Sequence, residues 1–133
     1  MLKVHHIGYL VKNHKRGRDA ILALGYKSVT EPVFDELRGV NISFVEKDGY
    51  VVELISPETG DSVVSGLYKK LGNSPYHICY STDDFDGEIE RLTKSGYVMF
   101  EEPKPAVAFE NKRVCFLVHP FLGMIEILDK EDD

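Results

Sequence analysis

Four ionisable side chains of this 133-residue chain occupy positions where a buried apolar residue would be expected. They are His6, Glu53, His77 and Glu126. Both histidines begin apolar runs that are typical of strands, and both glutamates lie in the middle of such runs. Two imidazoles and two carboxylates suit a divalent ion of borderline hardness, such as Zn, Ni, Co, Mn or Fe. We therefore predict a site for one divalent metal ion, with a coordination position left for a substrate oxygen that the ion would polarise.

An internal repeat relates these four residues to one another. A shift of 77 − 6 = 71 residues places His6-Ile7 on His77-Ile78, and Gly25-Tyr26 on Gly96-Tyr97. Further along the chain, a shift of 126 − 53 = 73 places Glu53 on Glu126. Taken singly, a strand glutamate is most often solvated and a strand histidine is usually structural. Structural roles would not make the set symmetric, so the repeat favours a metal site.

The repeat also organises the secondary structure, because each half predicts a strand, a helix and then several strands. Module one is expected over residues 1–57, a crossover over residues 58–73 with a short helix at Val64–Leu71, and module two over residues 74–133. The two modules should pack as a single α+β domain, since no low-complexity linker separates them.

Both long helices are predicted from apolar spacing and a closing glycine. In the second half, Phe85, Ile89 and Leu92 form a stripe at i, i+4 and i+7, and Gly96 ends the helix. The first helix carries Ala20, Ile21 and Leu24 and ends at Gly25. After it, an Asp-Gly pair at residues 48–49 predicts a tight hairpin between two strands.

Composition excludes several classes of function. With 16 basic and 22 acidic residues, the net charge of −6 argues against a general affinity for nucleic acid. No apolar run approaches the roughly 20 residues needed to cross a membrane. The N-terminus lacks a signal-peptide core, so a cytoplasmic location is expected. The two cysteines, Cys79 and Cys115, lie in apolar runs and are expected to be buried free thiols.

The chain resembles the vicinal oxygen chelate superfamily, which groups glyoxalases, bleomycin-resistance proteins and methylmalonyl-CoA epimerases. The segments that carry the resemblance are His6–Val11, Val52–Pro57, Tyr76–Tyr80 and Gly123–Ile127. The resemblance implies two βαβββ modules whose sheets curl around a metal-binding cleft. It also places the family's metal ligands on the four residues identified above, and it implies a small-molecule substrate and a homodimer.

Within the superfamily, the segment from Glu53 to Leu67 is most similar to the methylmalonyl-CoA epimerases. Lactoylglutathione lyases, the alternative with the same ligand set, usually carry an aromatic pair where this chain has Asp19-Ala20. A third, lower-ranked interpretation is a drug-binding relative that uses no metal, whose cleft typically lacks these ligands.

The chemistry that this resemblance implies is proton abstraction next to a carbonyl. Glu126 or Glu53 would act as the general base, with Glu36 as a second acid or base. Alignment with the epimerases places Leu37 at their catalytic glutamate, one residue from Glu36. A coenzyme A thioester would need a basic patch for its phosphates, for which Lys112 and Arg113 are the candidates.

A second basic cluster occurs at the start of the first helix. Its members are Lys12, His14, Lys15, Arg16 and Arg18. We interpret this cluster as a solvated helix face in preference to a phosphate site.

Overall fold

The computed structural model describes residues 1–60, 62 and 64–130. Asp61 and Val63 of the predicted crossover, and residues 131–133 of predicted module two, lie outside the described residues. The chain forms two units. The first unit is residues 6–76, and the second combines residues 1–5 with residues 77–133. Each unit is described separately below.

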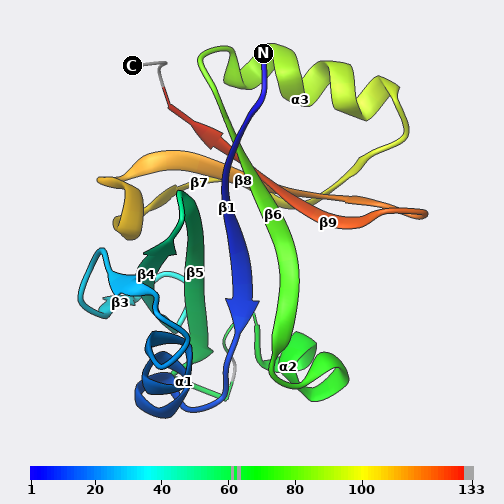
Figure 1. Cartoon of the computed structure of the whole chain (residues 1–133). Coiled ribbons are helices and arrows are strands. Elements are labelled where there is room, and N and C mark those ends of the chain that lie inside the picture. The colour runs from blue at the N-terminus through cyan, green and yellow to red at the C-terminus, as the bar shows by residue number, and fades with distance from the viewer. Residues whose placement is uncertain (61, 63, 131–133) are drawn as a thin grey trace. The chain divides into compact units, whose positions relative to one another are not determined.

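The first unit is a mixed sheet in the strand order β2-β4-β5-β1, with β3 also paired to β4 (Figure 1). β5 runs parallel to β1 and antiparallel to β4. Two helices accompany the sheet. The strands are β1 (Lys3–Leu10), β2 (Lys27–Ser28), β3 (Val33–Asp35), β4 (Val40–Lys47) and β5 (Tyr50–Pro57), and the helices are α1 (His14–Leu22) and α2 (Ser65–Leu71).

The second unit repeats this pattern in the strand order β6-β9-β8-β7 (Figure 1). β9 is parallel to β6 and antiparallel to β8. The elements are β6 (Ser74–Thr82), α3 (Phe85–Lys94), β7 (Val98–Ala106), a single 3-10 turn η1 (Val107–Phe109), β8 (Lys112–His119) and β9 (Gly123–Asp129). The predicted α+β class and the two βαβββ modules are therefore confirmed, with β3 as an additional short strand in the first unit.

The hairpin between β4 and β5 sets the register of the first sheet. Asp48 and Gly49 both have positive φ, 53° and 84°, as a two-residue type I′ turn requires. Lys47 therefore pairs with Tyr50, and three residues further from the turn Phe44 pairs with Glu53. A side chain on one strand and its partner across the ladder share a face, so this turn determines which side chains surround Glu53.

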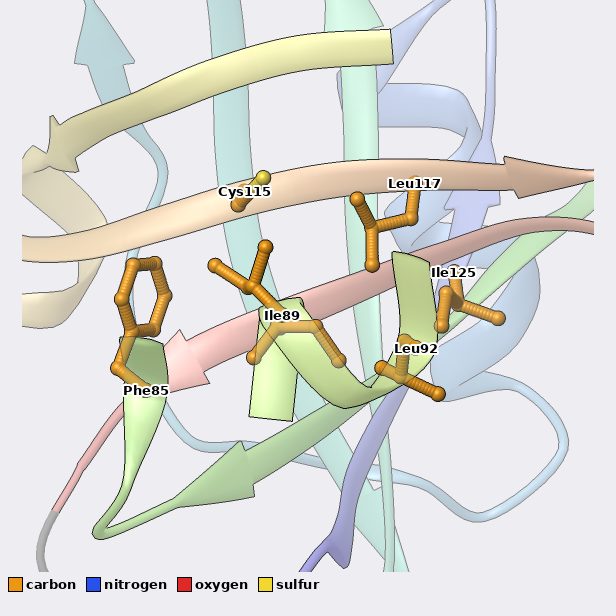
Figure 2. Packing of buried hydrophobic residues seen from close by; sticks show 7 residues of the cluster. Phe85, Ile89, Leu92, Cys115, Leu117 and Ile125 are labelled. Atoms are coloured by element: carbon orange, nitrogen blue, oxygen red, sulfur yellow. The ribbon is translucent and has the colours of Figure 1, made fainter. Parts of the chain in front are cut away.

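The core of the second unit confirms the predicted helix stripe. Phe85, Ile89 and Leu92 of α3 are buried against β8 and β9, as Figure 2 shows. Their partners on the strands are Cys115, Leu117, Ile125 and Ile127. Burying each of the three helix side chains contributes about 1.5–3 kcal/mol, so this face accounts for the docking of α3. Gly96, with φ of 102°, follows the helix as predicted.

The first helix differs from its prediction, because two of its three predicted apolar residues, Ala20 and Leu24, are exposed. Leu24 was expected on its buried stripe, but α1 ends at Leu22 and Leu24 is 68% exposed. The helix buries none of its residues, although Ile21 and Leu22 pack partly against Val11, Val45, Val52 and Leu54. Leu24 lies beyond the end of α1, and Gly25, with φ of 101°, then turns the chain toward β2.

Cys79 and Cys115 are buried and form no disulfide bond, as predicted. Burial, and to a lesser extent the charge of Glu101, raises the pKa of Cys115 to about 11. No helix among the described residues is long and apolar enough to cross a membrane.

His14 begins α1 and connects it to the sheet. Its Nε2 lies 2.7 Å from the Ser43 hydroxyl, and its Nδ1 lies 2.9 Å from the Ser56 hydroxyl. Both serines are buried. Burial, and secondly the nearby Arg18, lower the pKa of His14 below its ordinary value of 6.5.

We predict a specific pH dependence of stability from His14. Well above pH 6.5 the imidazole is neutral in both the folded and the unfolded chain. As the pH falls below 6.5, the unfolded chain binds a proton that the folded chain does not, so the free energy of unfolding should decrease. Urea titrations at several pH values on each side of 6.5 should show a smaller decrease for His14→Gln than for the wild type. Equal decreases in the two proteins would contradict this role.

Candidate metal centre

The first unit brings together His6 and Glu53, two of the four predicted ligands. His6 Nε2 lies 3.2 Å from Glu53 Oε1, and both side chains are almost fully buried. His6 comes from β1 and Glu53 from the parallel neighbour β5, where Glu53 pairs in register with Gly8. Side chains alternate along a strand, so His6 and Gly8 share a face and the imidazole reaches the carboxylate diagonally.

The second unit brings together His77 and Glu126 in the same way. His77 Nε2 lies 3.1 Å from Glu126 Oε1, and these side chains are also almost fully buried. His77 comes from β6, and Glu126 pairs with Cys79 on that strand from the parallel strand β9. In both units, the glutamate is thus in register with the residue two positions after the histidine. The sequence repeat therefore corresponds to a His–Glu pair with the same strand register and nearly the same separation in each unit.

An aromatic ring completes each pair, and sequence reasoning did not identify it. Phe44 packs edge-on against His6 at 5.5 Å between ring centroids, and Phe116 packs against His77 at 5.2 Å. Each phenylalanine is also in register with the glutamate of its own pair. The Asp-Gly turn could have predicted the position of Phe44. Counting paired residues outward from that turn places Phe44 opposite Glu53. The connection between β8 and β9 is longer, so its sequence does not fix which residue of β8 pairs with Glu126.

Each pair fits a divalent metal ion of the predicted kind. Two ligand atoms about 2.1 Å from one ion are about 3.0 Å apart at a right angle and about 3.4 Å apart at a tetrahedral angle. The observed separations of 3.1 and 3.2 Å lie between these values. The donor set of imidazole nitrogen and carboxylate oxygen also matches ions of borderline hardness. Each pair could therefore hold two adjacent coordination positions of one ion.

Glu36, the predicted second base, lies in the turn between β3 and β4. Its side chain is exposed, and the neighbouring Leu37 is 59% exposed. This turn precedes Val40, at the start of β4, whereas Glu53 is opposite Phe44. Four strand residues span about 13 Å. The first unit therefore does not bring Glu36 to Glu53, and the role of Glu36 stays a prediction.

Lys112 and Arg113, the predicted phosphate contacts, lie on opposite faces of β8. Lys112 shares the face of Phe116, and hence of Glu126. Arg113 instead stacks over the ring of Phe85, 4.5 Å from its centroid. Lys112 is therefore the one of the two that faces the side of the His77–Glu126 pair.

The charge of Arg113 is already matched by carboxylates. Its guanidinium lies 3.0 Å from Asp129 and 3.5 Å from Asp86. The hydrogen bond to Asp129, together with the charges of Asp86 and Asp129, outweighs the opposing effect of desolvation and raises the pKa of Arg113. A guanidinium with two carboxylate neighbours is a weaker candidate for binding phosphate than Lys112, for which no ion pair is found among the described residues.

The chain belongs to the glyoxalase/bleomycin resistance protein/dioxygenase superfamily, whose family model matches residues 5–116. A curated relative, the uncharacterized protein YqjC of Bacillus subtilis, is 25% identical over 118 residues, which cover 88% of this chain and 83% of that protein.

Two solved structures illustrate the similarity of fold. Hypothetical protein BH1468 from Bacillus halodurans has a TM-score of 0.84 and 25% identity, over 99% of this chain and 96% of that chain. Methylmalonyl-CoA epimerase from Streptomyces coelicolor, in complex with 2-nitronate-propionyl-CoA, has a TM-score of 0.78 and 22% identity, over 95% of both chains. These likenesses agree with the fold that the sequence resemblance implied.

Proposed function

We propose that this chain is a metal-dependent epimerase or isomerase that removes a proton next to a carbonyl, similar to methylmalonyl-CoA epimerase. The observation that carries the proposal is the buried His–Glu pair that occurs with the same geometry in both units. The desolvation of a buried imidazole and carboxylate is costly even when the two are paired, and a metal ion bound by both would offset that cost. Such pairs are what a metal-dependent carbon-acid enzyme requires.

We further propose that both pairs serve one divalent ion, which Zn, Ni, Co, Mn or Fe could supply. His6, Glu53, His77 and Glu126 would be its ligands. When bound, the ion would act as a Lewis acid that stabilises negative charge on the carbonyl oxygen of the substrate. The support for one shared site is the symmetry of the two pairs together with the family to which the chain belongs.

In this proposal the glutamates also handle the proton. Glu126, or Glu53, acts as the general base that takes the proton from the carbon next to the carbonyl. Burial of both carboxylates excludes water, which would otherwise compete for the proton. Glu36 is the candidate second base, and two bases on opposite faces of a carbon would produce epimerisation.

The proposed substrate is a coenzyme A thioester. The support comes from the similar epimerase structure that holds 2-nitronate-propionyl-CoA. Lys112 is the candidate contact for a phosphate of this substrate, and Arg113 is a weaker one because of its carboxylate neighbours. We also propose that the protein works as a homodimer, as the family resemblance implies, and that it works in the cytoplasm.

One preparation assayed against two substrates tests the proposed function. Metal-free protein is reconstituted separately with each candidate ion and supplied with methylmalonyl-CoA or with the glutathione hemithioacetal of methylglyoxal. We expect metal-dependent turnover of methylmalonyl-CoA and at least about 100-fold lower activity on the hemithioacetal. The reverse preference would assign a lactoylglutathione lyase. Absence of turnover together with absence of metal binding would favour a drug-binding relative.

A further inference from the structure

A groove of about 670 Å³ lies within the first unit, on the sheet face opposite to His6 and Glu53. Val52 and Leu54 line it, and because they flank Glu53 on β5 their side chains point away from the metal-ligand face. Tyr9 of β1, Val11 directly after β1, and Ile21 of α1 complete an apolar floor. This groove is therefore separate from the His6–Glu53 pair.

The groove exists because α1 fills its side of the sheet poorly. Under the shift of 71 residues, 85 − 14, the buried Phe85, Ile89 and Leu92 of α3 correspond to His14, Arg18 and Ile21. The His14 side chain hydrogen-bonds to Ser43 and Ser56, and Arg18 contacts Ser28 and Glu31. Neither side chain therefore fills the space that Phe85 and Ile89 fill in the second unit. Ala20, which lines the groove, is too small to close it, whereas Gly17 already lies in close contact with Val11.

The rim of the groove is positively charged. Lys12 and Arg16 both line it, and no ion pair is found for either side chain among the described residues. By contrast, Lys15 on the same helix lies 3.2 Å from Asp19. No carboxylate occurs among the described residues that line the groove, while Tyr68 and Asn73 add neutral hydrogen-bonding groups. Two cations above an apolar floor complement an anion with an apolar tail.

We propose that this groove binds a small amphipathic carboxylate, such as a medium-chain fatty acid. Its tail would lie over Ile7, Tyr9 and Ile21, which line the groove and are partly exposed, and its carboxylate would be bound by Lys12 and Arg16. The volume is within the range of about 300–1,000 Å³ that is usual for small-molecule sites. This second site is independent of the proposed metal chemistry, because it lies on the other face of the sheet.

Calorimetric titration with decanoate tests the proposal. We expect saturable binding of one decanoate per chain, and an increase in Kd of at least about tenfold in the double variant Lys12→Gln/Arg16→Gln. Lys15→Gln, which removes a cation from the same helix outside the groove, should bind as the wild type does. Ala20→Phe, which fills the groove, should also weaken binding. The charge variants change exposed side chains, so they remain informative if Ala20→Phe does not fold.

Further titrations distinguish this site from the proposed metal site, from a coenzyme A site and from an interface between two copies of the chain. Decanol should bind more weakly than decanoate, and Glu126→Gln or added chelator should leave decanoate binding unchanged. The proposal is overturned if the wild type shows no saturable binding, if the double variant binds equally well, or if free coenzyme A displaces decanoate. It is likewise overturned if Ala20→Phe dissociates a dimer without affecting decanoate, because the groove would then be an interface between two copies of the chain.

Discussion

Glu126→Gln is expected to abolish the exchange of solvent deuterium into methylmalonyl-CoA. A glutamine side chain cannot accept the proton from carbon, and loss of a general base typically slows a reaction by about 100-fold to 10,000-fold. Incubation in D2O followed by mass spectrometry measures the uptake of one deuterium per substrate. Undiminished uptake by the variant would eliminate Glu126 as the base.

Two further variants make this experiment decisive. Glu53→Gln changes the matched carboxylate of the first unit, so the more impaired of the two variants identifies the base. Glu90→Gln is the control, because Glu90 is exposed on α3 and paired with Lys94. It should exchange deuterium at the wild-type rate. Rates are expressed per bound metal ion, so that loss of a base is not confused with loss of a ligand.

His6→Gln and His77→Gln are each expected to remove the metal ion from the protein almost completely. If one ion is shared, its four ligands come from both units, and the loss of either imidazole affects the same site. The affinity should decrease by more than the roughly 10–100-fold that is typical of changes outside the ligand shell. Elemental analysis after loading with zinc and desalting should give about one ion per wild-type chain.

The stoichiometry separates a shared site from two independent ones. Two independent sites would give two ions in the wild type and one in each variant, and that result would refute the shared site. His119→Gln serves as the control histidine, because His119 stacks against Tyr97 in the second unit and belongs to neither pair. It should retain the full metal content. Thermal unfolding of all variants confirms that each is folded before it is loaded.

The internal repeat made the His–Glu pairs and the two modules predictable. Residues that match under a fixed shift must occupy equivalent strands, and strand alternation then determines which face each side chain takes. The stripe of α3 and the Asp-Gly hairpin were predictable for a similar reason, since helix periodicity and turn geometry depend on local residues. The superfamily resemblance extended this reading to the fold, which the family match and the solved structures support.

Other features depended on which elements pack against each other. From the sequence, Lys112 and Arg113 were predicted to form one basic patch. In the structure, Phe85 and Asp86 of α3 contact Arg113 and not Lys112. From the sequence, the basic cluster from Lys12 to Arg18 was interpreted as one solvated helix face. In the structure, Lys15 pairs with Asp19 and Arg18 with Glu31. Lys12 and Arg16 instead lie on the rim of the groove.

The amino-acid sequence by itself thus determined the two His–Glu pairs, the repeated modules and the register of the first hairpin, because each follows from local periodicity or from the repeat. Only the tertiary structure decided that Phe44 and Phe116 pack on the histidines, that α1 leaves an apolar groove, and which cations are paired. These outcomes depend on how side-chain volumes and charges from distant segments match across an interface, and no local pattern specifies that match.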